Sequence, residues 1–314
     1  ANSLEGDPGF LSNTYLHIVG TFVNNTGDNF VPVSTDIDGD SRPFPFSTIV
    51  DPGADEHDPP SCPPPSDLRT FSPGVDSITL IVDNGNTPDY YYEFVAAGAP
   101  QGTGFFGTIS SDSARVGGLM EGTNYDVYLR EVCSRGDSSL WLGPITFSTA
   151  YRIPFIEDFE TFIPGNDVNP WPNGWESIDN NSTYLNAWTS DYSANVPFAA
   201  VPDVDHTLGT DSGMFMYFVP GFLGGSADFI SPPVLIDSSI NLFELKYWYH
   251  SGGADVDRMQ VYMRIEGVDS LLIEYVGRQQ LATSDPWRQG RHLFSGYEGQ
   301  SVQFVFRGFG PLNF

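Results

Sequence analysis

The sequence predicts an all-β fold, and three observations predict it. Glycine and proline are frequent, at 33 and 25 of 314 residues, and both mark turns. Phenylalanine and tyrosine are abundant, at 24 and 15 residues, as is typical of strands. Short runs of alternating apolar and polar residues recur along the chain, and no stretch keeps a helical period over three turns. Such runs, separated by turns, are typical of β-sandwiches.

The charge of the chain excludes several classes of partner. Forty acidic residues stand against 13 basic ones, which gives a net charge of −27. Nucleic acids and anionic membrane surfaces both need a cationic partner, so neither is expected. Polar residues interrupt every apolar run before the roughly 18 residues that a membrane helix needs, so no membrane insertion is expected. Carboxylates do supply the oxygen ligands that calcium prefers.

Residues 1–60 form the first segment, in which turn-forming residues surround one short predicted strand at Tyr15–Val19. Its apolar content is too low for a core of its own. The pieces that carry a resemblance are Gly6–Phe10, Tyr15–Ile18, Thr35–Pro43 and Pro52–Glu56. In this order they resemble the C-terminal end of a secreted right-handed parallel β-helix. The resemblance implies that β-helix coils of the same chain precede Ala1, because terminal coils close coils before them.

Within this segment, Asp36–Asp40 has the composition of a calcium-binding loop. An EF-hand loop carries glycine at its sixth position and glutamate at its twelfth. Here the glycine is fourth and the twelfth residue is Ser47. We therefore favour a structural turn.

Residues 61–150 form the second segment, with alternating strands predicted over 76–82, 91–95, 125–129 and 145–148. The stretch Gly118–Leu129, with Asp67-Leu68 and Phe147–Thr149, resembles a fibronectin type III domain. In that topology Cys62 precedes the first strand and Cys133 ends the sixth. The resemblance favours a disulfide between them over two free thiols, and hence an oxidising compartment. The disulfide would close a loop of about 70 residues and stabilise the domain by about 4 kcal/mol in the chain-entropy model.

Residues 151–314 form the third segment, which is again rich in predicted strands. These strands cover 214–219, 242–250, 259–265, 271–275 and 302–307. The motifs that carry a resemblance are Asp158–Glu160, Asp205–Thr207, Ser212–Tyr217, Ala227–Pro233, Leu245–His250, Val261–Met263, Gly277, Trp287 and Val302–Gly308. Together they resemble a MAM domain and related jelly-roll adhesin modules of bacterial surface proteins. Two departures matter: the usual cysteines are absent, and Gly310–Phe314 stops before the closing strand with its paired acids. The domain is therefore expected as a jelly roll that lacks its closing strand, or receives that strand from elsewhere.

The MAM resemblance implies a structural calcium site. In the MAM pattern, the acidic residue of the opening strand corresponds to Glu160 and the loop aspartate corresponds to Asp205. Asp203 or Asp211 lies close enough in sequence to complete the coordination shell of the calcium ion. The alternative is that these are solvated loop acids, and the residues do not decide between the two.

Catalytic patterns are missing from the sequence. The five histidines show no H-E-x-x-H spacing, and there is no G-x-S-x-G motif. We therefore expect this part of the protein not to be an enzyme. Gly102–Gly107 matches a dinucleotide fingerprint as a string, but it opens no predicted helix.

Aromatic side chains are the remaining indication of function. Trp171, between two prolines, is the candidate for a ligand contact at the surface, since aromatic rings stack on sugars. Trp175 and Trp188 are expected in the core instead. At least one of Tyr90, Tyr91 and Tyr92 should face solvent, because neighbours on a strand point to opposite sides.

The three segments in series resemble large bacterial surface proteins exported by type IX secretion. The resemblance implies a non-catalytic, extracellular adhesion or binding region that contacts glycan or a neighbouring cell. The alternative is an accessory spacer tail of a polysaccharide-degrading β-helix enzyme, with its catalytic coils upstream.

Overall fold

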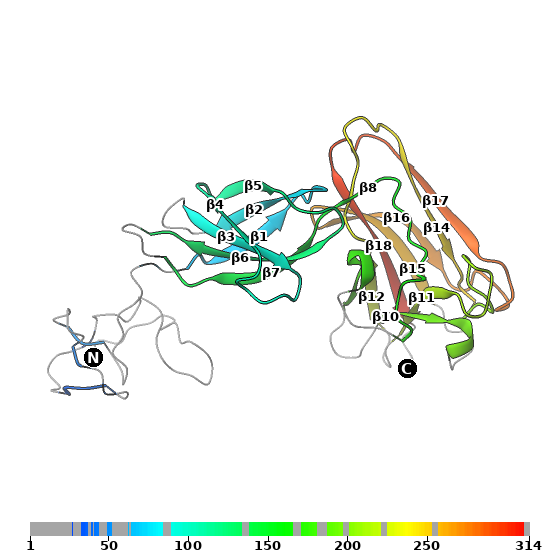
Figure 1. The fold of residues 1–314 in the computed structure, drawn as a ribbon. Helices are drawn as coiled ribbons and strands as arrows, with labels where there is room; N and C mark the ends of the chain where they lie inside the picture. Colours follow the sequence, from blue (N-terminus) through cyan, green and yellow to red (C-terminus); the bar gives the residue numbers. More distant parts are fainter. Residues whose placement is uncertain are drawn as a thin grey trace.

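The computed structural model contains two β-sandwiches that follow one another along the chain (Figure 1). The prediction of an all-β fold is confirmed. The structure describes these residues: 27, 33–36, 39, 41–43, 49–51, 62, 64–83, 89–133, 138–165, 171–180, 187–196, 201–220, 225–252 and 257–310.

The first sandwich has a three-stranded and a four-stranded antiparallel sheet. The three-stranded sheet has the order β1-β2-β5, and the four-stranded sheet the order β4-β3-β6-β7. This is the strand order of a fibronectin type III domain, as the sequence predicted. The strands are β1 (Asp67–Phe71), β2 (Ser77–Asp83), β3 (Tyr90–Ala96), β4 (Phe105–Ile109), β5 (Ser113–Gly117), β6 (Asn124–Glu131) and β7 (Leu142–Ser148).

The core of the fibronectin-like domain follows directly from the alternation of its strands. On β2, the inward side chains Ile78, Leu80 and Val82 are each at most 3% exposed. They belong to one continuous cluster of 13 buried residues that both sheets share. Cys62 and Cys133 form a disulfide with their Cα atoms 5.7 Å apart, so that prediction is confirmed.

The second sandwich is built on a large sheet with the main order β16-β15-β18-β12-β9, to which the short strands β13 and β8 attach through β18. The strand β8 pairs in parallel with β13, and the other pairs are antiparallel. The strands of this sheet are β8 (Tyr151–Arg152), β9 (Glu176–Asp179), β12 (Gly225–Ile230), β13 (Val234–Leu235), β15 (Arg258–Ile265), β16 (Val268–Val276) and β18 (Ser301–Gly310).

The opposite layer of the second sandwich is divided into two separate antiparallel pairs. One joins β10 (Ala187–Tyr192) to β11 (Met214–Val219), and the other joins β14 (Phe243–Tyr249) to β17 (Arg288–Phe294). Two short 3-10 turns, η2 (Pro172–Gly174) and η3 (Ser193–Asn195), complete the elements of this domain. The buried residues likewise form two clusters rather than one, and Phe306 packs against both.

The two sandwiches meet at a hydrogen-bonded junction around β8 (Figure 1). The amide of Tyr151 donates to the Pro233 carbonyl at 2.9 Å, and its hydroxyl donates to the Gly122 carbonyl at 3.1 Å. Arg152 forms an ion pair with Glu121, and the Ser301 hydroxyl bonds the Pro73 carbonyl. Both domains therefore contribute polar groups to the same contact.

Most of the first segment, for which a β-helix end is expected, lies outside the described residues. The described part supports the turn at Asp36. Gly39 has φ +94° and donates to the Asp36 carbonyl at 3.3 Å, and Thr35 bridges to Ser41. Among the described residues, no helix has the length and apolar content needed to span a bilayer.

Candidate functional site

A cavity of about 1170 Å³ lies between the two layers of the second sandwich. Its floor is β18, where alternate residues, from Val302 through Phe304 and Phe306 to Gly308, line it. Residues two apart on a strand share a face, so the floor is the inner face of the large sheet. Protein interiors rarely leave a void of this size, which means that the two layers do not close on each other here.

The sides of the cavity are the edges of two strands. Every residue of β11 and every residue of β14 lines it, whereas β17 contributes none and β10 contributes only Trp188. A strand that lines a space with all of its residues, not alternate ones, presents its edge to that space. Among the described strands β11 pairs only with β10, and β14 only with β17. The unpaired edges of β11 and β14 therefore border the cavity.

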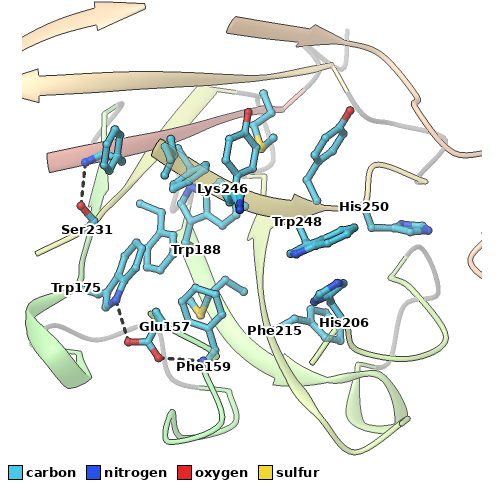
Figure 2. Close-up of a pocket in the computed structure, with 18 of the residues that line it drawn as sticks. Glu157, Phe159, Trp175, Trp188, His206, Phe215, Ser231, Lys246, Trp248 and His250 are labelled. Atoms are coloured by element: carbon cyan, nitrogen blue, oxygen red, sulfur yellow. Dashed lines mark hydrogen bonds between the residues drawn. The ribbon is translucent and has the colours of Figure 1, made fainter. Parts of the chain in front are cut away.

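An aromatic cluster joins β14 to the loop before β11, at one end of the cavity (Figure 2). The His206 ring stacks on the Trp248 ring with centroids 3.9 Å apart and planes 21° apart. Trp287 donates its indole N–H to the Val204 carbonyl at 2.9 Å and contacts Phe215 edge-on at 5.9 Å. Trp248 is still 43% exposed, the highest value of the six tryptophans. It is thus an aromatic ring held in place and open to solvent.

The two histidines of this cluster are disposed to be neutral near pH 7. Partial burial lowers the pKa of His206, and the nearby Asp205 only partly opposes it. Burial likewise lowers the pKa of His250, whose ring contacts Trp287 at 5.9 Å. Because neutral imidazoles carry no charge, the cluster presents an uncharged, stacking surface.

The predicted calcium ligands Glu160 and Asp205 lie on either side of the start of β11. Both Glu160 carboxylate oxygens accept from the Met214 amide at 3.3 Å. Asp205 is 2% exposed and packs on Gly213, where a Cβ atom would lie 2.1 Å from its carboxyl carbon. Burial and the negative charge of Asp205 raise the pKa of Glu160, against the Met214 hydrogen bond. Two hard-oxygen carboxylates close together, without a basic partner among the described ion pairs, fit the chemistry of a calcium site.

The other two predicted ligands are less well placed. The Asp205 carboxylate already accepts the amides of Leu208 at 2.6 Å and Thr210 at 2.9 Å. Asp203 and Asp211 are exposed and are tied to neighbouring loops through their backbone groups. Within the described part of the chain, no three acidic, histidine or cysteine side chains gather as metal ligands. The structure therefore brings together Glu160 and Asp205 but not the full predicted set.

The expectation that Trp171 lies at the surface is wrong. Its side chain is 2% exposed and packs against Phe162 and Phe229, at centroid distances of 5.9 and 5.2 Å. Trp175 and Trp188 lie in the same core, as predicted, and both stack on Phe229. Trp171 is thus part of the core, and no ligand contact is assigned to it.

Sequence reasoning also missed a buried ion-pair network on the outer face of the large sheet. Asp228 accepts from Arg307 at 2.5 and 2.8 Å, and Asp269 accepts from Arg264 at 2.6 and 3.0 Å. Arg307 also reaches Asp269 at 3.2 Å and so connects the two pairs. Asp228 faces Arg307 across β12 and β18, and Arg264 faces Asp269 across β15 and β16. This strand register is the signal that would have predicted the ion pairs. That register is not visible before the strands are paired.

Comparison with known protein families agrees with the second sandwich. A family model of the MAM domain, meprin/A5/mu, matches residues 173–313. The match spans the jelly roll from η2 to the end of β18. The chain therefore carries a MAM-like domain after a fibronectin type III-like domain.

Solved structures similar to this chain include two fibronectin type III domains and a structure described as a myokine. The FN5 domain of Drosophila Lar is 17% identical, with a TM-score of 0.25, over 28% of this chain and 96% of its own. The fn3 domain of human collagen alpha-1(XX) chain is 21% identical, with a TM-score of 0.26, over 30% of this chain and 91% of its own. A structure described as a myokine is 17% identical, with a TM-score of 0.25, over 28% of this chain and 98% of its own. The fibronectin-like assignment made here rests on the strand order described above.

Proposed function

We propose that this chain is a non-catalytic, extracellular binding region that contacts glycan through its MAM-like domain. The observation that carries the proposal is the exposed ring of Trp248, held by His206 at one end of the cavity. A fixed aromatic face with polar neighbours is the kind of surface on which sugar rings stack. The disulfide supports an oxidising, extracellular location. In this proposal the parent protein is a large secreted or cell-surface adhesin.

The first sandwich has the features of a rigid spacer. Its core is continuous, and the junction ties it to the MAM-like domain by bonds from both sides. Such an arrangement holds the binding domain at a fixed distance and orientation. The fibronectin-like domain acts as a spacer in this proposal.

The test is binding of the full chain to a panel of polysaccharides and host glycans, with Trp248→Ala compared with Trp141→Ala. Trp141 lies in the fibronectin-like domain, where Arg130 stacks on it at 4.7 Å, and so controls for loss of a tryptophan. We expect Trp248→Ala to weaken binding at least about tenfold, or about 1.4 kcal/mol, and Trp141→Ala to leave it unchanged. Absence of binding by the unaltered chain, or equal loss in both variants, would overturn the proposal.

We also propose that Glu160 and Asp205 hold a structural calcium ion. Calcium takes oxygen ligands and would offset the repulsion between these two carboxylates. Added calcium should then raise the melting temperature of the MAM-like domain, and Glu160→Gln should abolish that rise. Glu266→Gln, in the turn between β15 and β16, is the matched control and should keep it. An unchanged melting temperature in calcium would rule out the site.

A further inference from the structure

Two basic side chains lie directly opposite each other on the face of the β14–β17 pair that points away from the core. Phe243 and Leu245 of β14 pack with the core, so the alternate residues of that strand point outward. The register places Lys246 opposite Arg291. We use the name β14–β17 face for the six outward residues of the two strands, which are Glu244, Lys246, Trp248, Gln289, Arg291 and Leu293.

The two cations share one acidic partner. Lys246 Nζ lies 3.0 Å from one carboxylate oxygen of Glu244, and Arg291 forms an ion pair with the other oxygen. Every other group of ion pairs among the described residues has at least as many acids as bases. Like charges directly opposite on paired strands repel each other. The β14–β17 face therefore has one positive charge in excess, in a chain with 40 acidic and 13 basic residues.

The excess charge is open to solvent and lies beside the ring of Trp248. The Lys246 side chain is 54% exposed and that of Arg291 is 60% exposed, whereas that of Glu244 is 19% exposed. Lys246 and Trp248 are two residues apart on β14, which corresponds to about 7 Å (Figure 2). A sugar stacked on the ring would thus have both cations within reach of its own substituents or of those on the next sugar.

We propose that the glycan bound at Trp248 is acidic, and that Lys246 and Arg291 bind its carboxylate or sulfate group. This inference rests on the proposed function, because it assigns a charge to the glycan that the same ring holds. The anion would accept hydrogen bonds from the ammonium and from the guanidinium. It would also supply the second negative charge that the two cations lack.

The net charge of −27 does not prevent such binding. Exposed charges more than about 8 Å apart are largely screened at physiological ionic strength, so the two adjacent cations dominate the interaction with a bound anion. An acidic peptide could use the cations but would not need the ring. An aromatic face beside a pair of cations instead matches a ligand that has both a flat apolar side and an anionic substituent, as acidic sugars have.

Matched polymers test this inference. Polygalacturonate is compared with its methyl ester, and dextran sulfate with dextran, so that the members of each pair share a backbone and differ in charge. We expect the full chain to bind at least one acidic polymer about tenfold more tightly than its neutral counterpart. Preference for polygalacturonate identifies a carboxylate as the recognised group, and preference for dextran sulfate identifies a sulfate.

Charge substitutions locate the effect. Lys246→Gln and Arg291→Gln should each weaken binding of the preferred acidic polymer about fivefold, the upper end for an exposed charge pair, and leave binding of the neutral one unchanged. Arg69→Gln removes the same charge from an exposed ion pair of the fibronectin-like domain and is the control. Glu244→Gln should strengthen binding of the acidic polymer, because it frees both cations from their shared carboxylate. A variant that only disturbed the fold would not produce this gain.

The possible failures can be told apart. Equal binding of acidic and neutral polymers, abolished by Trp248→Ala, would overturn this inference and leave the proposed function standing. Equally tight binding of polyglutamate, unaffected by Trp248→Ala, would also overturn it, because charge alone would then be recognised. Binding of none of the polymers would overturn the proposed function and this inference with it.

Discussion

The two sandwiches of this chain have similar strands but differ in how completely they close. In the fibronectin-like domain, 13 buried residues from both sheets form a single cluster. In the MAM-like domain the buried residues form two clusters, and a cavity of about 1170 Å³ lies between the layers. Strands with alternating apolar residues occur in both domains, such as β2 in the first and β18 in the second. Alternation therefore produces strands with an inner face, but closure also needs the right number of strands in each layer.

The domains also differ in how they hold buried charge. The fibronectin-like domain buries Glu93 completely, and its carboxylate accepts the amides of Gly102 at 2.8 Å and Gly104 at 3.0 Å. The MAM-like domain uses the ion pairs among Asp228, Arg307 and their neighbours instead. One domain thus anchors a glycine-rich loop with a buried acid, and the other ties four strands together with paired charges.

The largest expected effect comes from the disulfide, which only the fibronectin-like domain has. Replacing Cys62 and Cys133 together with serine frees a loop whose ends are 71 residues apart. The chain-entropy model gives a loss of about 4 kcal/mol in the unfolding free energy of that domain. Urea unfolding followed domain by domain would measure it. A loss of the same size in the MAM-like domain would show that the two domains unfold together.

Asp228→Ala should lower the unfolding free energy of the MAM-like domain instead. The substitution leaves the partly buried Arg307 side chain without its main partner. Breaking such a pair costs about 3 kcal/mol, which is the lower end of the usual range. Chemical denaturation should show a lower midpoint for the MAM-like domain and an unchanged midpoint for the fibronectin-like one. Glu298→Ala, at an exposed turn acid of the same domain, is the matched control and should change neither midpoint.

Matched leucine substitutions compare the two cores directly. Leu80 is fully buried in the continuous core, whereas Leu245 on β14 borders the cavity. Leu80→Ala creates a new void and should cost about 3 kcal/mol. Leu245→Ala enlarges an existing void and should cost about 1 kcal/mol, because fewer contacts are lost. Equal costs, measured by denaturant unfolding, would mean that the cavity is closed in solution.

The smallest effect concerns the pH dependence that Glu160 gives to the MAM-like domain. Its pKa in the folded state is raised above 4.5, mainly by burial and further by Asp205. The folded state therefore holds the proton more tightly than the unfolded state, and stability falls as pH rises from about 4.5 through the folded pKa. Glu160→Gln should flatten this fall by less than about 1 kcal/mol in calcium-free buffer, since the group is partly exposed. Thermal melts from pH 4 to 8 would measure it, and a steeper fall in the variant would contradict the assignment.

The sequence was sufficient to predict about half of the described strands, together with the fibronectin-like topology and the disulfide. These depend on local alternation and on a strand order that short motifs identify. The three consecutive tyrosines illustrate this, because Tyr90 is fully buried while Tyr91 is 38% exposed. Gly102–Gly107 likewise opens a strand, β4, and no helix, so its match to a dinucleotide motif is accidental.

The site residues were harder to predict because they depend on contacts between distant segments. Flanking prolines place Trp171 outside a strand, but its burial depends on Phe162 and Phe229 folding over it. Trp248 is part of an alternating strand, and only the loop that carries His206 turns it into a stacked, exposed ring. The carboxylate pair is partly predicted, since the resemblance identified Glu160 and Asp205 but the packing leaves Asp203 and Asp211 apart.

The disulfide also determines how a pulling force would travel through the first domain. A load applied before Cys62 would cross the sulfur bridge to Cys133 and continue along β7 to the junction. Residues 63–132, which contain β1 to β6, would lie outside the loaded path. Under tension along the chain, the first domain would therefore extend by only a short length. Of the two sandwiches, the MAM-like domain would then stretch first, because its divided layer carries no covalent bridge among its described residues.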